Sequence, residues 1–202
     1  MTIRLLLADD QALVRGALAA LLDLEADLSV VAEVGSGDAV VAAATKHAPD
    51  VALLDVEMPG MDGIEATRAL KQALPSTRVL IVTTFGRPGF LRRALQAGAD
   101  GFVVKDTPAR QLADAVRRVQ AGLRVVDPVL AADSLVAGDS PLTARETDVL
   151  RAARDGSSVA AIAAAVFLSE GTVRNHLSSA IGKTGAANRA EAGRIADAHG
   201  WL

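Results

Sequence analysis

The 202-residue sequence contains no cysteine. Disulfide frameworks, thiolate zinc sites and cysteine nucleophiles are therefore excluded. Its apolar runs all fall short of the roughly 18 to 20 residues that a helix needs to span a bilayer. The first residues also lack the basic-then-apolar pattern of a secretory signal. We expect a cytoplasmic protein that does not enter a membrane.

An excess of basic residues is missing as well, because 21 Lys and Arg face 24 Asp and Glu, for a net charge of −3. A chain without an overall positive field can bind nucleic acid only through a local surface, helped by dimerisation. Half of the residues are hydrophobic. At this length they suffice for the core of one large or two small domains.

Over the first 121 residues, stretches of strand type alternate with stretches of helical spacing. Several of the strand-type stretches are apolar at successive positions, as is expected when helices cover both faces of a parallel sheet. With the right-handed crossover rule, this predicts a doubly wound α/β domain with a parallel five-stranded sheet over residues 1–121. The expected strands are Ile3–Ala8, Leu28–Val34, Val51–Leu54, Val79–Val82 and Gly101–Val104.

The periodicity weakens after residue 121, and only helical patterns follow residue 140. We interpret residues 122–140 as a linker and residues 141–202 as an all-α domain. Thr143 stands three residues before Glu146, which is the spacing of a capping box at a helix start. The expected helices of this domain are Leu142–Asp155, Ser157–Val166, Ser169–Ile181 and Asn188–His199.

Acidic, hydroxyl and ammonium groups stand at the carboxyl ends of the predicted strands, where open parallel sheets bind ligands. Asp9 and Asp10 follow the first strand, Asp55 follows the third, Thr83 ends the fourth, and Lys105 follows the fifth. Three carboxylates at one edge favour Mg²⁺, which would neutralise the adjacent acidic pair. The hydroxyl and the ammonium complete a phosphate site. In it Asp55 is the nucleophile that forms an acyl phosphate, and Thr83 and Lys105 stabilise the transferring oxygens.

Each of these residues also has an ordinary structural interpretation. Asp10 alone is more often a helix N-cap, Thr83 a β-branched strand residue and Lys105 a solvated charge. Their joint occurrence at one edge favours the site. A phosphatase with Asp55 as nucleophile and Glu57 as acid–base partner is an alternative, but it would need an entrance lid that these short loops do not offer. A regulator that works without phosphorylation is a second alternative, and the intact site chemistry disfavours it.

The stretches LLLADDQ, LLDVEMPGMDG, LIVTTF and AGADGFVVKD resemble the receiver domain of two-component response regulators, which has a flavodoxin-like fold. The resemblance implies phosphorylation by a sensor histidine kinase, with no catalysis beyond the protein's own phosphorylation and dephosphorylation. It leads us to expect that phosphorylation draws the Thr83 hydroxyl toward the phosphate and lets Phe102 move inward. The implied roles are phosphoacceptor Asp55, Mg²⁺ ligands Asp9, Asp10, Asp55 and the backbone carbonyl of Glu57, and switch residues Thr83, Phe102 and Lys105.

The second half of the tail reads as a helix, a short turn and a second helix that begins at Ser169. Helical spacing alone would equally allow a packing hairpin in a small bundle. The polar face of the second helix favours a DNA reader, since Arg can bond guanine and Asn can bond adenine in the major groove. The candidate DNA contacts are Thr172, Arg174, Asn175, Ser178 and Lys183, with Lys183 assigned to phosphate.

PLTARETDVL and LSEGTVRNHLSSAIGKTGAANRAEA are similar to the LuxR-type helix-turn-helix of NarL/FixJ-type regulators. Within that family, TTFGRPGF and GTVRNHLS look most like the DesR subgroup. This likeness implies a transcription regulator, with control of membrane-lipid desaturase genes as the subgroup's role.

The tail carries seven basic and seven acidic residues from Gly138 onward, so one copy should bind DNA weakly. We therefore expect a homodimer of the phosphorylated protein to bind a double-stranded, two-fold DNA site. The last predicted helix shows a narrow apolar stripe with little else to cover, which we assign to dimerisation of the tails. The stripe consists of Ala192, Ile195 and Ala196.

Overall fold

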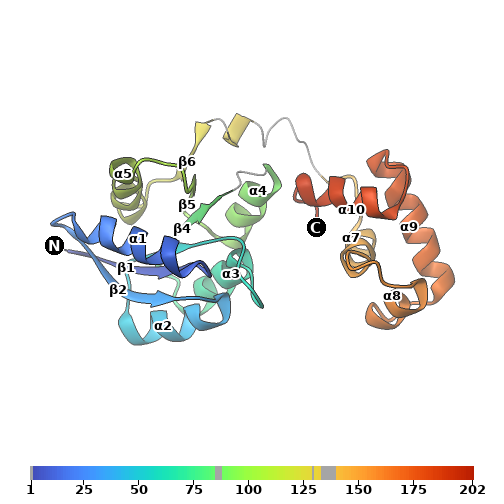
Figure 1. Ribbon diagram of the computed structural model, residues 1–202, viewed down its shortest axis with the longest axis horizontal. Coiled ribbons are helices and arrows are strands. Elements are labelled where there is room, and N and C mark those ends of the chain that lie inside the picture. The colour runs from blue at the N-terminus through green and yellow to red at the C-terminus, as the bar shows by residue number, and fades with distance from the viewer. Residues whose placement is uncertain (1, 85–87, 129, 133–139) are drawn as a thin grey trace. The chain divides into compact units, whose positions relative to one another are not determined.

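A computed structural model describes residues 2–84, 88–128, 130–132 and 140–202 of the chain (Figure 1). The chain forms two compact units, the first comprising Met1–Gly86 and Phe90–Ala132 and the second mainly Asp133–Leu202. The first unit therefore continues well into the segment 122–140 that the sequence suggests as a linker. Within the described ranges, no helix is both long enough and apolar enough to cross a bilayer.

The first unit is built on a parallel sheet with the strand order β2-β1-β3-β4-β5-β6. Its first five strands confirm the predicted ones, with β4 longer by one residue at each end. The sixth corrects the predicted count of five. Two residues are too few to show a period, so this strand is hidden in a segment without periodicity. The strands are β1 (Ile3–Ala8), β2 (Leu28–Val34), β3 (Val51–Leu54), β4 (Arg78–Thr83), β5 (Gly101–Val104) and β6 (Val125–Val126).

Helices cover both faces of this sheet, as the successive apolar residues predict. Two helices, α1 and α5, pack on one face and three, α2, α3 and α4, on the other (Figure 1). Alternate residues of each strand feed the two cores: Leu5 and Leu7 join the first, and Leu6 and Ala8 join the second. The helices are α1 (Ala12–Asp23), α2 (Val40–His47), α3 (Gly63–Ala73), α4 (Pro88–Ala97) and α5 (Ala109–Gln120), and η1 (Gly37–Ala39) is a short 3₁₀ helix.

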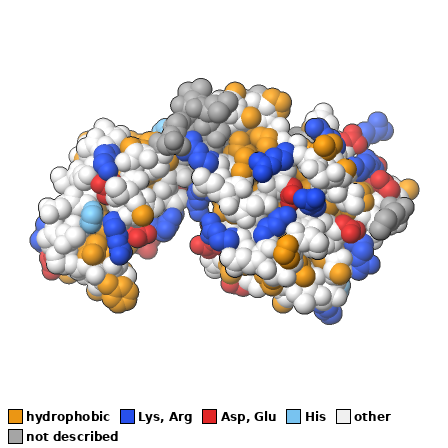
Figure 2. Space-filling model, turned by 180° about the vertical axis from the view of Figure 1, so that it is seen from behind, with side chains coloured by type: hydrophobic (Ala, Val, Ile, Leu, Met, Phe, Trp, Pro, Cys, Tyr) orange, Lys and Arg blue, Asp and Glu red, His pale blue; other side chains and the backbone are white. Residues whose placement is uncertain are grey.

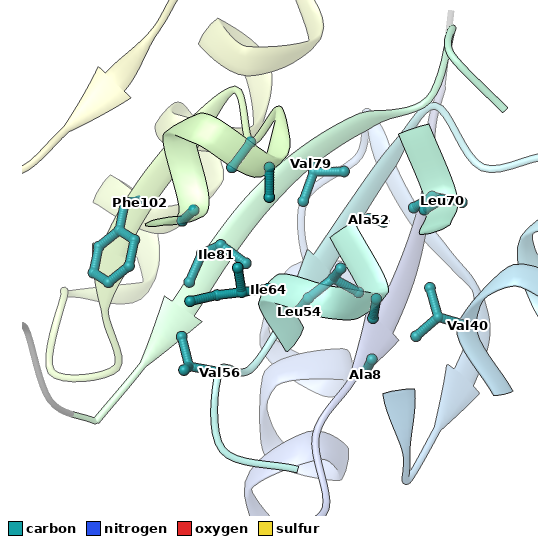
Figure 3. Close-up of a cluster of buried hydrophobic side chains, with 14 of the residues drawn as sticks. Ala8, Val40, Ala52, Leu54, Val56, Ile64, Leu70, Val79, Ile81 and Phe102 are labelled. Carbon is teal, nitrogen blue, oxygen red and sulfur yellow. The ribbon is translucent and has the colours of Figure 1, made fainter. Parts of the chain in front are cut away.

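The core on the side of α2, α3 and α4 gathers aliphatic side chains around the strands β1, β3 and β4 (Figure 3). Phe102 on β5 lies at one end of this cluster and is fully buried. Leu130, from the residues that follow β6, belongs to the same core. The sheet edge at β5 is thus covered by the chain that leads to the second unit.

Helix starts in the first unit differ in how their backbone N–H groups are satisfied. Asp62 caps α3, because its Oδ1 accepts hydrogen bonds from the backbone of Ile64 and Glu65 at 2.8 and 2.7 Å. Asp10 does not cap α1, which corrects the ordinary interpretation of that residue. The N-cap of α1 is Gln11, and its side chain makes no capping bond. Asp10 is exposed at the sheet edge instead.

The second unit is all helical in its described residues, as the sequence predicts. Each helix begins after a polar N-cap, Thr143, Ser158, Ser169 or Asn188, whose side chain accepts a backbone hydrogen bond. Thr143 and Glu146 form the expected capping box. The helices are α7 (Ala144–Ala152), α8 (Val159–Ala165), α9 (Glu170–Thr184) and α10 (Arg189–Ala198).

The end of the chain completes the core of this second unit. Leu202 is buried there, and the indole ring of Trp201 stacks on the imidazole of His199 with ring centroids 4.6 Å apart. Trp201 is the only tryptophan of the sequence, which contains no tyrosine.

Candidate functional site

The sheet register brings the acidic residues of the first unit together. Ala8 and Leu54 are paired across β1 and β3, so Asp9 and Asp55 follow neighbouring residues at the same edge. Ligand oxygens of Asp9, Asp10 and Asp55 all lie within 4.8 Å of one another. Asp9 and Asp55 are buried, whereas Asp10 is exposed. The edge therefore combines two carboxylates that are shielded from water with one that is open to solvent.

Lys105 links this cluster to the next two strands. Its Nζ lies 2.7 Å from Asp9 Oδ2 and 2.8 Å from Asp55 Oδ2. Its backbone N–H donates to the carbonyl of Thr83 at 2.7 Å. Since one ammonium faces three carboxylates, the ionised cluster keeps a net negative charge.

The electrostatics of the site separate Asp55 from its neighbours. Burial raises the pKa of Asp55, and the nearby Asp9 carboxylate adds to this rise against the opposing effect of Lys105. For Lys105 burial alone would lower the pKa, but the hydrogen bonds to Asp55 and Asp9 outweigh it and raise the pKa. The lysine thus stays charged at neutral pH, and a further cation would favour the ionised form of Asp55.

Among the buried polar atoms that have no hydrogen-bond partner in the described residues are Asp55 Oδ1 and the Thr83 hydroxyl, both at this edge. Buried polar atoms left without partners are uncommon and call for a ligand or an ordered water. The donor set is made of carboxylate oxygens, which suit Mg²⁺. Glu57 is exposed in the loop after β3, and the role of its carbonyl as a further ligand stays a prediction.

We predict that Asp10→Asn weakens Mg²⁺ binding at least about tenfold, since even residues outside the ligand set commonly contribute that much to metal affinity. Titration of the purified protein with Mg²⁺, followed calorimetrically, measures the dissociation constant. Asp38→Asn, which changes an acidic residue outside the cluster, is the matched control. An Asp10→Asn protein that binds Mg²⁺ as tightly as the control would refute the assigned site.

The proposed switch residues Thr83 and Phe102 are both fully buried. Thr83 ends β4 beside the cluster, and Phe102 lies on β5, paired with Ile81 of β4. Any inward movement of Phe102 would therefore start from an interior position rather than from solvent.

Sequence reasoning missed Arg15. Its guanidinium donates to the backbone carbonyl of Asp9 and lies 3.6 Å from Glu33 Oε2. The side chain thus fixes the turn that carries the acidic pair. The available signal was a cationic residue about one and a half helical turns after the acidic pair. The sequence pattern alone does not show that its side chain turns back toward that pair.

In the second unit, four of the five candidate DNA contacts lie exposed on α9: Arg174, Asn175, Ser178 and Lys183. Thr172 is half-buried and its hydroxyl lies 2.8 Å from that of the N-cap Ser169. Arg174 pairs with Glu170, one turn earlier, at 2.7 Å. On the face drawn in Figure 2, basic and acidic side chains of this unit lie side by side, in keeping with its balanced charge.

Lys183 is exposed, but its ammonium already has a partner, so its contact with a DNA phosphate stays a prediction. Its Nζ lies 2.7 Å from Oε2 of the buried Glu146, which also accepts a hydrogen bond from Ser179 at 2.6 Å. Burial alone would raise the pKa of Glu146, but hydrogen bonds from Lys183, Ser179 and Thr143 outweigh it and lower the pKa to about 2. The pair fastens α9 to the start of α7, and a periodic sequence pattern cannot reveal such a partner on another helix.

We expect Glu146→Gln to destabilise the second unit by about 2 kcal/mol, the range of hydrogen bonds to charged groups. A depressed pKa gives a stabilisation that is complete above the ordinary value of 4.5 and is lost as the pH falls toward about 2. Calorimetric unfolding of the wild type should show this loss, and the variant should lack it. Glu170→Gln, which removes an exposed carboxylate, is the control. Equal pH profiles for wild type and Glu146→Gln would contradict the assignment.

The proposed dimerisation stripe of the tail needs correction. Ala192 and Ala196 are fully buried in the core of their own unit, packed with α7 and α9. Their small side chains permit close helix contact within one copy and leave no surface for a second. Ile195 is only partly buried, so its role in dimerisation stays a prediction.

Comparison with known proteins agrees with this layout. Residues 5–117 match the response regulator receiver domain, and residues 140–196 match the family described as bacterial regulatory proteins, luxR family. The chain is 42% identical over 200 residues to the transcriptional regulatory protein YvfU of Bacillus subtilis, covering 99% of this chain and 100% of the relative. It is 40% identical to the transcriptional regulatory protein DesR of the same organism, covering 99% of each. A solved RcsB–DNA complex is similar with a TM-score of 0.68 and 25% identity, covering 98% of this chain and 99% of that one.

Proposed function

Because the chain belongs to the response regulators that join a receiver domain to a LuxR-type DNA-binding domain, we propose that phosphorylation of Asp55 by a sensor histidine kinase switches it. It is a DNA-binding transcription regulator. In the proposed cycle, the phosphorylated protein dimerises and binds a two-fold DNA site. The observation that carries the proposal is the buried Asp55 with one unpartnered carboxylate oxygen, set between Asp9, Asp10 and Lys105.

The proposed chemistry is an in-line transfer to Asp55. One carboxylate oxygen forms a bond to the phosphorus of a phosphohistidine, the bond from phosphorus to the imidazole nitrogen breaks, and the imidazole leaves with its electron pair. Lys105 then exchanges its contact with Asp55 for one with a phosphoryl oxygen. The Thr83 hydroxyl, which has no acceptor among the described residues, gains one in the same group.

Asp9, Asp10, Asp55 and the carbonyl of Glu57 are the residues proposed to hold Mg²⁺. When bound, the metal neutralises charge that builds up on the transferring oxygens. Asp9 and Lys105 orient the Asp55 carboxylate, and burial shields this carboxylate from water. An acyl phosphate made in such a site adds negative charge, which Lys105 alone would not offset.

On the DNA side, α9 is proposed to enter the major groove, with Arg174, Asn175 and Ser178 facing base edges and Thr172 beside them. The exposed position of the first three supports this assignment. The likeness to DesR suggests membrane-lipid desaturase genes as the proposed target class. Genome-wide footprinting that finds no site near such genes would reject that target class alone.

The decisive experiment is Mg²⁺-dependent labelling of the full-length protein with acetyl phosphate, followed by peptide mass mapping. We expect the label to be one phosphoryl group on Asp55. When Mg²⁺ is chelated before the phosphodonor is added, we expect no labelling. Labelling at another residue, or labelling that ignores Mg²⁺, would contradict the proposed function. Continuous release of phosphate from many small phosphoesters would instead favour the phosphatase alternative.

A further inference from the structure

The segment that follows α5 packs back onto the first unit before the chain continues to the second. We call residues 125–128 and 130–132 the strap. Val125 and Val126 form β6, which is parallel to β5 and pairs Val126 with Phe102. Pro128 and residues 130–132 are helical. The strap thus lies at the edge strand that also leads into Lys105.

The strap is held mainly by apolar contact. Leu130 is only 9% exposed and belongs to the core that contains the fully buried Phe102, and Val126 packs against that core. Asp127 orders the turn, because its Oδ1 accepts a hydrogen bond from the backbone of Leu130 at 3.2 Å. Leu130 and Phe102 therefore belong to the same buried cluster, and Phe102 lies at one end of the part drawn in Figure 3.

The pairing of the strap with the sheet is short. β6 has two residues, and the Val125 N–H donates to the carbonyl of Asp100 at 3.3 Å, near the upper limit for a hydrogen bond. On the side of α5, a groove of about 300 Å³ separates the strap from the helix, lined by residues such as Gln111, Ala115 and Arg118. A two-residue edge strand with an open groove behind it forms only a short ladder to oppose the entropy of release.

β5 connects the strap to the candidate phosphoacceptor site over four residues, Gly101–Val104. Lys105 follows directly. Its ammonium pairs with the Asp55 carboxylate, and its backbone N–H donates to the carbonyl of Thr83. A group on Asp55 that attracts both Lys105 and the Thr83 hydroxyl acts on the ends of β4 and β5 together. The same two strands carry the paired residues Ile81 and Phe102, and Phe102 is also the partner of Val126 in the strap.

We propose that the strap is a latch that is docked in the unphosphorylated protein and released by phosphorylation of Asp55. The proposal rests on the proposed function. In the docked state Leu130 and Phe102 hold β5 in its present position, and in the released state residues 125–132 join the connection between the two domains. By linkage, weakening the latch favours the released state without any phosphate.

Release changes the reach of the DNA-binding domain. Fully extended, the seven residues 133–139 span at most about 25 Å, whereas the fifteen residues 125–139 span about 50 Å. A longer connection lets each tail take up more positions and orientations relative to its own receiver domain, which makes it easier for the two tails of a dimer to meet two half-sites together. This is the proposed physical link between the latch and DNA binding.

Hydrogen exchange of the full-length protein tests the latch through the backbone amides of Leu130 and Ala131. We expect protection in the unphosphorylated wild type, and exchange at least about tenfold faster in Leu130→Ala, because a buried leucine side chain commonly contributes more than this factor. Asp127→Ala, which leaves the core intact, should act in the same direction. Leu123→Ala changes a leucine that is 53% exposed beside the strap and should exchange like the wild type.

Acetyl phosphate with Mg²⁺ should speed the exchange of the same amides in the wild type and leave Asp55→Asn unchanged. Without phosphodonor, Leu130→Ala should also bind a two-fold DNA site several-fold more tightly than Leu123→Ala. Protection that stays constant in protein shown by mass to carry the phosphoryl group would overturn the latch and leave the proposed function standing. Absence of labelling would overturn the proposed function. Equal exchange in Leu130→Ala and wild type would overturn docking itself.

Discussion

Asp55→Asn should reduce phosphoryl incorporation to background while the protein stays folded. The carboxylate oxygen that would attack phosphorus is replaced by an amide of nearly the same volume, so the nucleophile disappears and the packing remains. Acetyl phosphate labelling, read by intact mass, measures the loss. Asp106→Asn is the control, because it removes an exposed carboxylate one residue after Lys105 and should label like the wild type.

The same variant should unfold at a higher temperature than the wild type when Mg²⁺ is absent. Burial raises the pKa of Asp55. The ionised carboxylate therefore lowers the stability of the folded state once the pH exceeds the unfolded value, and the amide removes that penalty. Full labelling of Asp55→Asn would show that another residue is the acceptor. A lower melting temperature would show that the charged Asp55 stabilises the apo site through Lys105 instead.

The phosphorylated protein should bind a perfect two-fold DNA site about 10² to 10⁴ times more tightly than a single half-site. A tail with balanced charge makes few phosphate contacts, but the second tail of a dimer binds at the high local concentration set by the first. Quantitative footprinting of both DNAs, with and without acetyl phosphate, measures the ratio of the two affinities. The unphosphorylated protein should show little preference.

Two substitutions check that the ratio arises from α9. Arg174→Ala should weaken binding by roughly 1 to 3 kcal/mol at one base position if the side chain reads a base edge. Arg145→Ala, which removes an exposed arginine of α7, should have a smaller effect that does not depend on sequence. Comparable occupancy of the two-fold site and the half-site by the unphosphorylated protein would contradict a switch that acts through dimerisation.

The local pattern of the sequence predicts the elements well and their partners poorly. The apolar runs locate five strands because each is long enough to show its period, and the N-caps of α7 and α9 follow from their side chains. The convergence of Asp9, Asp10 and Asp55 also follows, since the carboxyl ends of parallel strands share one edge. These inferences need only spacing and topology.

Contacts between distant elements could not be obtained in this way. Lys183 looks like any exposed lysine of a helix until Glu146 is seen beneath it, and Ala192 looks uncovered until α7 and α9 are placed around it. The strand β6 is equally invisible, because two valines gain their conformation from β5 and not from their own pattern. In each case tertiary packing decides what local propensity leaves open.

The stacking of Trp201 on His199 has a practical consequence for separating the two domains. With no tyrosine and a single tryptophan in the sequence, fluorescence excited in the indole band originates entirely in the DNA-binding domain. Its emission will report when the partly buried indole reaches water fully, and it will not change when only the receiver domain opens. Circular dichroism reports on the helices of both. Denaturant curves recorded with the two signals will therefore separate when the domains unfold independently with different stabilities, and the part of the dichroism change that the fluorescence does not follow reports the receiver domain.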